Sequence, residues 1–352
     1  NYGGNVVMRK GELRNSIIEN GVAIYGNMLN MQTSCGGAGI VGTSSDITVI
    51  NSVIRNNKAI SANGGGYYGP VTFINCLINN NSATVEEQYG NGFAYGGAGT
   101  NTDDARYPFA KHYNSTIVNN YAHSGVGGIS NYDFVYNSIL WGNRTEGDVT
   151  SNLSYGNNGA NIYTNVYYSA VEGGCLGEGN ITLNADNSGS DDVNYPMFVN
   201  PTIAVGAGNY GAGDWRLQDG SVCVNRGTTT TQITDIDLDG NTRIVNDSID
   251  MGAYESNFGI NHEIIPDAND IVYVTEEGAG TKDGSSWANA TPYLQFAMDR
   301  IYQYERPIKF WIAKGTYKGN GVPSNPAFIM TDNVSLYGGF AGHEEANFDR
   351  SE

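Results

Sequence analysis

The sequence has few charged residues, and basic residues are especially scarce. Charged residues make up 15% of the 352 residues, and 18 Lys and Arg stand against 36 Asp and Glu, which gives a formal net charge of −18. Because phosphate groups would be repelled and no run of five basic residues occurs, we expect no nucleic-acid partner. Cations and neutral sugars are the small partners that this charge favours.

Long apolar runs and a cysteine framework are missing too. No apolar stretch approaches the roughly 18 residues that a membrane span needs, so we expect no membrane span in this segment. The four cysteines (Cys35, Cys76, Cys175 and Cys223) include no C-x-x-C pair, which argues against a zinc site and a disulfide scaffold. Cys76 is interpreted as a small packed residue, and a disulfide between Cys175 and Cys223 remains an alternative to two free thiols.

Glycine and tyrosine, by contrast, are abundant. The 48 Gly residues are nearly twice the usual share of about 7%. Hydrophobic residues reach 39% and aromatic residues 11%, with 24 Tyr, which is typical of an ordered chain rather than a disordered one. The length allows one large core or two domains.

A short phrase with the consensus N-S-x-[IL]-x-N recurs five times, at residues 15–20, 51–56, 75–80, 114–119 and 137–143. Its starts are 36, 24, 39 and 23 residues apart, so the basic period is 23 or 24 residues and two intervals carry insertions. Gly-rich breaks separate successive phrases, at 36–39, 64–66, 96–99 and 127–128. The internal repeat predicts an array of stacked structural units.

Each phrase alternates and is rich in β-branched residues, as strands are, and each break supplies glycines for tight corners. Leucine-rich repeats share the period but need Leu at fixed spacing, and Leu is scarce here. We therefore predict an all-β fold, a right-handed parallel β-helix solenoid. Asn repeated at a corner tolerates the left-handed conformation and can bond its amide to the Asn of the next coil.

The sequence after the phrases resembles a known family, the right-handed parallel β-helix (pectate-lyase-like) surface proteins of Bacteroidetes-type bacteria. The matching stretches are 168–174, 180–181, 196–198, 214–217, 225–227, 237–244 and 250–255, in the order of that family's C-terminal region. Asn225 replaces the Asp that is common there. The resemblance implies that this region closes the solenoid and that a surface-anchoring segment often follows it.

The composition changes after Glu255, and residues 257–270 are predicted to be a linker. The remaining residues, 271–352, resemble the N-terminal start of the same family, with a capping helix near 292–303. Leu294, Ala297, Met298 and Ile301 recur with helical spacing and predict its apolar face. We therefore expect late coils and a closing region in 1–256 and the first strands of a second β-helix in 271–352.

Such a chain would be a segment of a longer tandem protein whose neighbouring modules are partners. In the alternative, residues 270–352 dock on the first solenoid as a single unit.

One acidic turn is a candidate metal site. Asp235, Asp237 and Asp239 precede Gly240 in the pattern D-x-D-x-D-G, the first half of a Ca²⁺ loop. Asn246 occupies the twelfth position, where such loops carry a bidentate Glu. The alternative is that Asp237 and Asp239 accept turn and cap hydrogen bonds.

Catalytic motifs are incomplete. The stretch 101–104 is similar to a polygalacturonase signature, in which clustered carboxylates act as general acid and base, but the later Gly-His-Gly and Arg-Ile-Lys motifs are absent. A polysaccharide lyase needs a basic residue, for which only Arg106 and Lys111 cluster. The candidate catalytic residues are Asp103, Asp104, Arg106, Lys111 and His112, with a solvated loop as the alternative.

Tyrosines gather in or beside two Gly-rich breaks and the long insertion at 84–111. Tyr rings offer a flat apolar face to sugars while their hydroxyls stay hydrated. Tyr113 belongs to this cluster, whose predicted sugar contacts are Tyr67, Tyr68, Tyr89, Tyr95 and Tyr107, and the alternative is that these rings pack between coils.

The repeats, the acidic low-charge composition and the incomplete catalytic motifs, together with what the family resemblance implies, predict an extracellular structural or adhesive β-helix segment of a large bacterial surface protein, secreted or held at the cell surface. A polysaccharide or host glycan is the predicted ligand. The alternative is a carbohydrate-active enzyme, a polysaccharide lyase or glycoside hydrolase, because the same scaffold hosts both kinds of protein.

Overall fold

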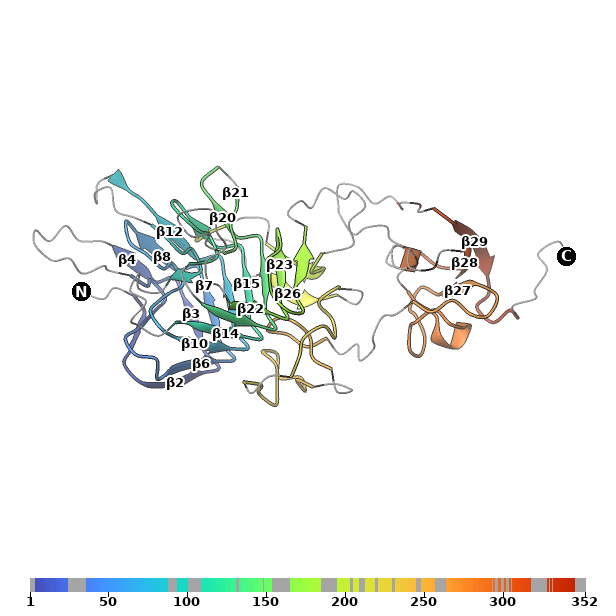
Figure 1. Cartoon of the computed structure of the whole chain (residues 1–352), viewed down its shortest axis with the longest axis horizontal. Helices are drawn as coiled ribbons and strands as arrows, with labels where there is room; N and C mark the ends of the chain where they lie inside the picture. The colour runs from blue at the N-terminus through green and yellow to red at the C-terminus, as the bar shows by residue number, and fades with distance from the viewer. Residues whose placement is uncertain are drawn as a thin grey trace, which may run out of the picture. The chain divides into compact units, whose positions relative to one another are not determined.

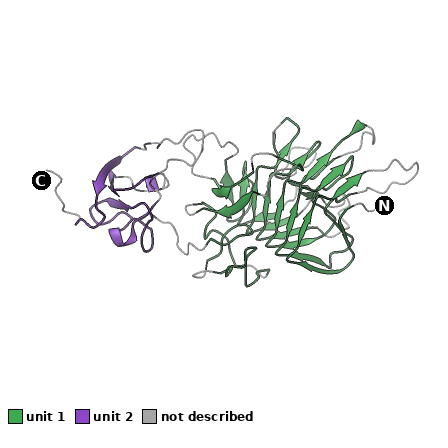
Figure 2. Ribbon diagram, turned by 180° about the vertical axis from the view of Figure 1, so that it is seen from behind, with its two compact units in different colours: residues 1–185, 194–258 green, residues 186–193, 259–352 purple. Residues whose placement is uncertain are grey.

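The chain forms two compact units in a computed structural model, and each unit is described by itself (Figure 2). Unit 1 comprises residues 1–185 and 194–258, and unit 2 comprises 186–193 and 259–352. The structure describes all residues except 1–3, 25–35, 88–93, 101–108, 131–132, 148, 154–164, 185–194, 203–204, 209–212, 219–220, 230–231, 245–247, 257–263, 293, 295–296, 299–300, 302–303, 305, 318–327, 329, 331 and 346–352.

The repeats of unit 1 are built of short strands in four sheets, called A to D, in which almost every pairing is parallel (Figure 1). Sheet A contains β1 (Val6–Met8), β5 (Ile40–Gly42), β9 (Tyr67–Tyr68), β13 (Gly99–Thr100) and β17 (Ile129–Ser130). Sheet B contains β2 (Gly11–Arg14), β6 (Ile47–Ile50), β10 (Thr72–Ile74), β14 (Lys111–Tyr113), β18 (Phe134–Tyr136) and β22 (Asn165–Tyr167).

Sheet C contains β3 (Ile17–Glu19), β7 (Val53–Arg55), β11 (Leu77–Asn79), β15 (Thr116–Val118), β19 (Ile139–Trp141), β23 (Ala170–Glu172) and β24 (Ile181–Leu183). Sheet D contains β4 (Val22–Ile24), β8 (Lys58–Ile60), β12 (Ser82–Thr84), β16 (Tyr121–Ala122), β20 (Arg144–Thr145) and the antiparallel β21 (Val149–Thr150). Through the first five repeats each sheet takes every fourth strand, so one repeat of the chain adds one strand to each sheet. This all-β arrangement of stacked parallel strands is compatible with a solenoid.

The repeated phrase forms the sheet C strand and its two corners. Its [IL] position points inward, and the column Ile18, Ile54, Ile78, Ile117, Leu140 is in register from strand to strand and buried. Both phrase asparagines adopt the left-handed conformation, as at Asn75 (φ 51°) and Asn80 (φ 54°). The consensus thus encodes one inward side chain and two sharp corners.

A ladder of buried asparagines runs between sheets C and D. Asn57 Nδ2 donates to Asn81 Oδ1 at 2.9 Å, Asn81 Nδ2 to Asn120 Oδ1 at 3.0 Å, and Asn120 Nδ2 to Asn143 Oδ1 at 2.9 Å. Asn143 Nδ2 continues to Asn152 Oδ1 at 2.7 Å. The prediction of Asn-to-Asn bonding along the stack is confirmed. Asn57, Asn81 and Asn120 directly follow the phrase and Asn143 ends it, whereas Asn152 lies beyond it.

Residues 168–173 form a sixth repeat rather than part of the closing region. Strand β23 pairs with β19 in sheet C, and its corners are Tyr168 (φ 49°) and Gly173 (φ 81°). The sequence pattern did not reveal this repeat, because Tyr168 stands where the other phrases begin with Asn and Val171 stands where they carry Ile or Leu.

The described parts of residues 196–256, named here the closing segment, pack against the outer face of sheet C. The segment contains the antiparallel pair β25 (Phe198–Asn200) and β26 (Asp214–Leu217). Trp215, Leu217 and Met251 are buried in one cluster with Leu77 and Ile139 of sheet C. Gly252 allows this close approach, because a Cβ there would lie 2.8 Å from Thr116 Oγ1.

Unit 2 is a parallel three-stranded sheet of β27 (Ile271–Val274), β28 (Ile308–Ala313) and β29 (Val334–Phe340), with a 3₁₀ turn η2 (Trp287–Asn289). Residues 294, 297 and 298 are helical. The predicted apolar face is confirmed, since Leu294, Ala297, Met298 and Ile301 are buried in one cluster with Phe310 of β28. Ile264, in the stretch predicted to be a linker, belongs to the same cluster.

Candidate functional site

Three tyrosines form a continuous row on the outer face of sheet B, the tyrosine row. Tyr113, Tyr136 and Tyr167 lie in register on β14, β18 and β22. The ring centroids of Tyr113 and Tyr136 are 5.6 Å apart with an interplanar angle of 14°, and those of Tyr136 and Tyr167 are 5.0 Å apart at 24°. The parallel register produces this stack, because it repeats one position at a spacing of about 4.8 Å.

The tyrosine row remains partly exposed and has polar and aromatic neighbours. Lys111, Phe134 and Asn165 form a second row on the same face, two residues earlier in each strand. Partial burial, and then the adjacent tyrosine, raise the pKa of Tyr113 and of Tyr136 above the usual value. The row therefore presents ring edges and protonated hydroxyls to solvent at neutral pH.

Among the predicted sugar contacts that the structure describes, Tyr67 does not reach the surface. Tyr67 is fully buried, Tyr68 is partly exposed, and Tyr95 is exposed. Tyr68 packs on the Gly-rich break, since a Cβ on Gly36 would lie 2.3 Å from its ring. Tyr89 and Tyr107 lie outside the described residues. Tyr113 belongs to the cluster of tyrosines noted in the sequence, but Tyr136 and Tyr167 were missed because they stand at the ends of strands, away from the Gly-rich breaks and the long insertion that guided the prediction.

The candidate catalytic residues fall in three different settings. Asp103, Asp104 and Arg106 lie outside the described residues. Lys111 is exposed on β14, and the adjacent His112 points to the opposite face of the sheet and is fully buried. The structure therefore does not bring Lys111 and His112 together at one surface.

His112 belongs to a buried polar cluster inside unit 1. Tyr67 Oη donates to Asp133 Oδ2 at 2.6 Å and lies 2.9 Å from His112 Nε2, and the His112 ring stacks on Phe73. Because the single Tyr67 proton goes to the carboxylate, His112 Nε2 is the donor in the second contact. Burial, followed by the charge of Asp133, raises the pKa of Tyr67 well above its usual value. Asp133 was not predicted, because a lone acid before a strand gives no signal.

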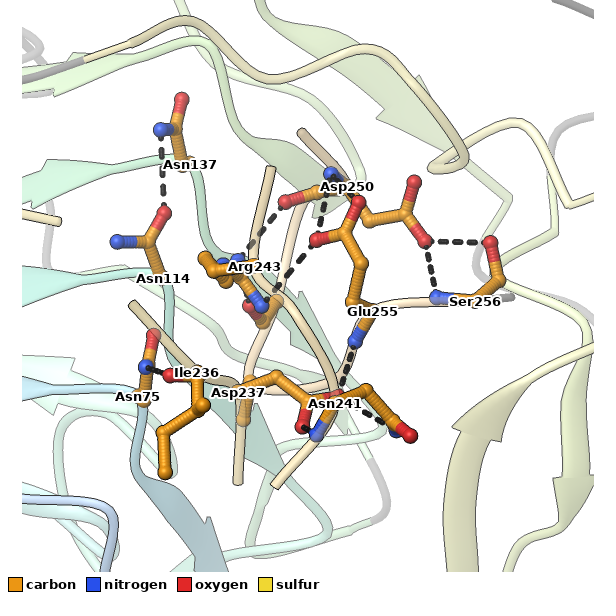
Figure 3. A network of polar contacts seen from close by, with 12 residues as sticks. Asn75, Asn114, Asn137, Ile236, Asp237, Asn241, Arg243, Asp250, Glu255 and Ser256 are labelled. Carbon is orange, nitrogen blue, oxygen red and sulfur yellow. Dashed lines mark hydrogen bonds and ion pairs between the residues drawn. The ribbon is translucent and has the colours of Figure 1, made fainter. Parts of the chain in front are cut away.

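Asp235, Asp237 and Asp239 do not converge. Asp237 is buried, and its carboxylate accepts the N–H groups of Asp239 (3.0 Å), Asn241 (2.7 Å) and Glu255 (2.6 Å) (Figure 3). Asp235 and Asp239 are exposed. In the part of the chain that the structure describes, no group of three or more His, Cys, Asp or Glu side chains is placed to hold a metal ion. Asp237 thus makes the turn hydrogen bonds proposed as the alternative to calcium.

A buried charged network surrounds Arg243 in the closing segment. Arg243 Nη2 donates to the carbonyls of Asp250 (3.0 Å) and Gly252 (2.7 Å), and Nη1 lies 3.6 Å from Glu255 Oε2 (Figure 3). Asp250 Oδ2 accepts both the N–H (2.7 Å) and the hydroxyl (2.6 Å) of Ser256. Burial, and then the nearby Asp250, raise the pKa of Glu255 to about 8. The network holds together two stretches of the closing segment, 237–244 and 250–255.

Corner asparagines fix the closing segment to the repeats. Asn75 Nδ2 donates to Ile236 O at 2.7 Å, Asn114 Nδ2 to Gln232 O at 3.3 Å, and Asn137 Oδ1 accepts the N–H of Thr228 at 2.8 Å. At the opposite corner, Asn119 Nδ2 donates to Thr202 O at 2.6 Å. The asparagines of the phrase therefore shape the corners and also bind the segment that covers sheet C.

Cys175 and Cys223 are free thiols, so the alternative of a disulfide between them is wrong. They belong to different hydrophobic clusters, one inside the repeats and one under the closing segment. Cys76 is buried, as predicted, and burial raises the pKa of its thiol to about 12.

Comparison with protein-family models found no match, and comparison with curated proteins found none either. The fold and surface define an all-β protein of stacked parallel sheets with an aromatic outer face. Among the described residues, no helix is long and apolar enough to cross a bilayer.

Proposed function

We propose that the chain is a structural and adhesive segment of a large extracellular surface protein of a bacterium, folded as a right-handed parallel β-helix, and that the tyrosine row binds a glycan. The observation that carries the adhesive part is the in-register stack of Tyr113, Tyr136 and Tyr167 on the outer face of sheet B. The surface location rests on the resemblance of the closing region.

The structural role is supported by how the repeats are joined. Asn120 is fully buried, and its amide bonds to the repeats on both sides. Identical bonds recur from Asn57 to Asn143, so bending the stack would break several buried hydrogen bonds together. Parallel crossovers are almost always right-handed, which supports the proposed hand of the helix.

The chemistry of the tyrosine row suits an uncharged sugar chain. The ring faces within the stack cover one another, so a ligand meets ring edges and hydroxyls, which offer apolar contact and hydrogen bonds side by side. Lys111 and Asn165 add donors in the second row. A strongly anionic polysaccharide would be repelled by a chain of net charge −18.

The test is retention of neutral and anionic polysaccharides and of host glycans on the immobilised protein. Tyr136→Ala interrupts the row at its centre and should weaken retention at least about tenfold, as expected for loss of a central aromatic contact. Tyr337→Ala removes an exposed tyrosine of unit 2 and is the matched control. Equal retention by both variants and the original protein would remove the tyrosine row as the binding surface.

The same screen separates adhesion from catalysis. Reducing or unsaturated ends should not accumulate when the protein is incubated with pectins, alginate or host glycans. If such ends do appear, and Asp103→Ala or Asp104→Ala abolishes them, the chain is a carbohydrate-active enzyme and the non-catalytic proposal fails.

A further inference from the structure

The tyrosine row crosses the strands of three consecutive repeats. Its ring centroids advance by 5.6 Å from Tyr113 to Tyr136 and by 5.0 Å from Tyr136 to Tyr167. This advance is close to that of one pyranose unit in an extended sugar chain. A chain that lies across the strands therefore meets one tyrosine per sugar, whereas a chain along one strand meets a single tyrosine of the row.

The closing segment borders one side of the row. Asn114 and Asn137 directly follow two of the row's tyrosines in the chain. Asn114 Nδ2 donates to Gln232 O at 3.3 Å, and Asn137 Oδ1 accepts the N–H of Thr228 at 2.8 Å. The closing segment thus passes the ends of both strands, which favours a ligand that lies across the strands over one that continues along them.

One end of the row is defined by burial. Ile74 occupies the position of Tyr113 one repeat earlier in the chain, and it is only 5% exposed. The accessible part of this column therefore begins at Tyr113. Lys111 lies on the same face two residues before Tyr113, so it stands beside this end of the row.

Lys111 is the one charged side chain among the six residues of the two rows. It is exposed and has no ion-pair partner among the described residues. An ammonium group in this position can donate a charge-assisted hydrogen bond to a carboxylate. The next members of its row are Phe134, which packs on Phe109 at a ring-centroid distance of 5.9 Å, and the uncharged Asn165. The surface therefore favours a carboxylate at one end and uncharged sugars along the rest.

We propose that the glycan is a linear chain of about three or more sugars that lies across β14, β18 and β22, one sugar per strand spacing, and ends in an acidic sugar whose carboxylate pairs with Lys111. This assignment rests on the proposed glycan binding by the tyrosine row. Lys111 selects the acidic end, and the tyrosines bind the uncharged sugars. A polymer with a carboxylate on every sugar does not fit, because its other carboxylates would lie over Phe134 and Asn165 on a protein of net charge −18.

The test compares the affinity of the full chain for oligosaccharides of equal length that differ in one acidic end. One pair is 3′-sialyllactose and 3′-galactosyllactose, and the other is xylotriose with a terminal glucuronic acid and xylotetraose. The acidic member of at least one pair should bind about fivefold more tightly, as expected for one exposed ion pair. The pair that shows this preference identifies the acidic sugar as a sialic acid or a uronic acid.

Variants of Lys111 test its part in this preference. Lys111→Gln keeps a hydrogen-bond donor without the charge, so the ratio of acidic to neutral affinity should fall to about one, and Lys111→Arg should restore it. Arg226→Gln removes an exposed basic residue of the closing segment, on the other side of the row, and is the matched control that should keep the ratio. Raised salt should lower the ratio of the original protein, since salt screens an exposed pair. Circular dichroism establishes that all variants are folded.

Equal affinity for both members of each pair overturns the inference, and so does a preference that survives Lys111→Gln or disappears in Arg226→Gln. Tyr136→Ala separates this failure from failure of the proposed function. If Tyr136→Ala weakens acidic and neutral members alike and no preference exists, the row binds glycans and only the assignment of Lys111 is wrong. If Tyr136→Ala weakens neither member, the row is not the binding surface, and the proposed function fails together with this inference.

Discussion

Asn120 and Asn143 are joined twice: Asn143 Oδ1 accepts both the side-chain amide of Asn120 at 2.9 Å and its backbone N–H at 3.0 Å. The same pair of bonds joins Asn81 to Asn120 and Asn57 to Asn81. One oxygen thus holds both the corner and the side chain of the preceding repeat. The ladder fixes the register between repeats through buried polar atoms, which tolerate no slip.

Replacing one member of this ladder should destabilise unit 1 strongly. Asn120→Ala leaves the Asn81 amide and backbone N–H without their acceptor and Ile78 O without its donor, all in the interior. At about 1–3 kcal/mol for each orphaned group, we expect a loss of at least about 3 kcal/mol in the free energy of unfolding. Urea unfolding followed by tryptophan fluorescence measures it.

Asn165→Ala is the control for this substitution, since Asn165 is partly exposed on the outer face of sheet B. It should change the free energy of unfolding by less than about 0.5 kcal/mol. Similar values for the two variants would mean that the ladder does not hold the repeats together.

The sequence predicted the repeat well because the phrase is local. Its inward Ile or Leu, its left-handed corner asparagines and the bonding along the stack follow from residues within one period. The sixth repeat was hidden because Tyr168 meets the backbone requirement of the first corner without Asn, and Val171 takes the inward position of Ile or Leu. A left-handed corner tolerates more residue types than a consensus suggests.

The position of the closing segment could not be predicted in this way. Its contacts with Asn75, Asn114 and Asn137 join residues more than 90 positions apart, and no pattern within either stretch specifies them. Tyr67 illustrates a related difficulty. It lies beside a Gly-rich break, as an exposed loop residue would, yet it points into the stack and bonds to Asp133.

The buried hydroxyl of Tyr67 should contribute strongly to the stability of unit 1. Tyr67→Phe keeps the ring but removes the partner of Asp133 Oδ2 and of His112 Nε2, both buried. We expect a loss of about 2–4 kcal/mol in the free energy of unfolding, from thermal or urea unfolding. Tyr136→Phe removes a partly exposed hydroxyl and should cost less than about 0.5 kcal/mol. If Tyr67→Phe leaves the free energy of unfolding unchanged, the buried hydrogen bonds of Tyr67 to Asp133 and His112 are contradicted.

Calcium should not stabilise the turn at 235–240. Asp237 already satisfies its carboxylate with backbone N–H groups, and Asp239 lies 3.9 Å from Arg216 rather than beside Asp235. The melting temperature should therefore be the same in chelator and in millimolar calcium. If it falls on chelation, recovers with calcium and loses that response in Asp235→Asn, the turn is a cation site after all.

Glu255 should make unit 1 less stable as the pH rises. Burial and the nearby Asp250 raise the pKa of Glu255 from 4.5 to about 8, so between these values the folded state holds a proton that the unfolded state has lost. Stability falls with pH wherever the folded state binds more protons. The contribution of Glu255 is therefore complete below about pH 4.5 and declines up to about pH 8. Glu255→Gln, which keeps the shape and cannot ionise, should flatten the decline in urea unfolding free energies measured from pH 5 to pH 8. An unchanged slope in this variant would mean that Arg243, 3.6 Å away, keeps Glu255 ionised throughout.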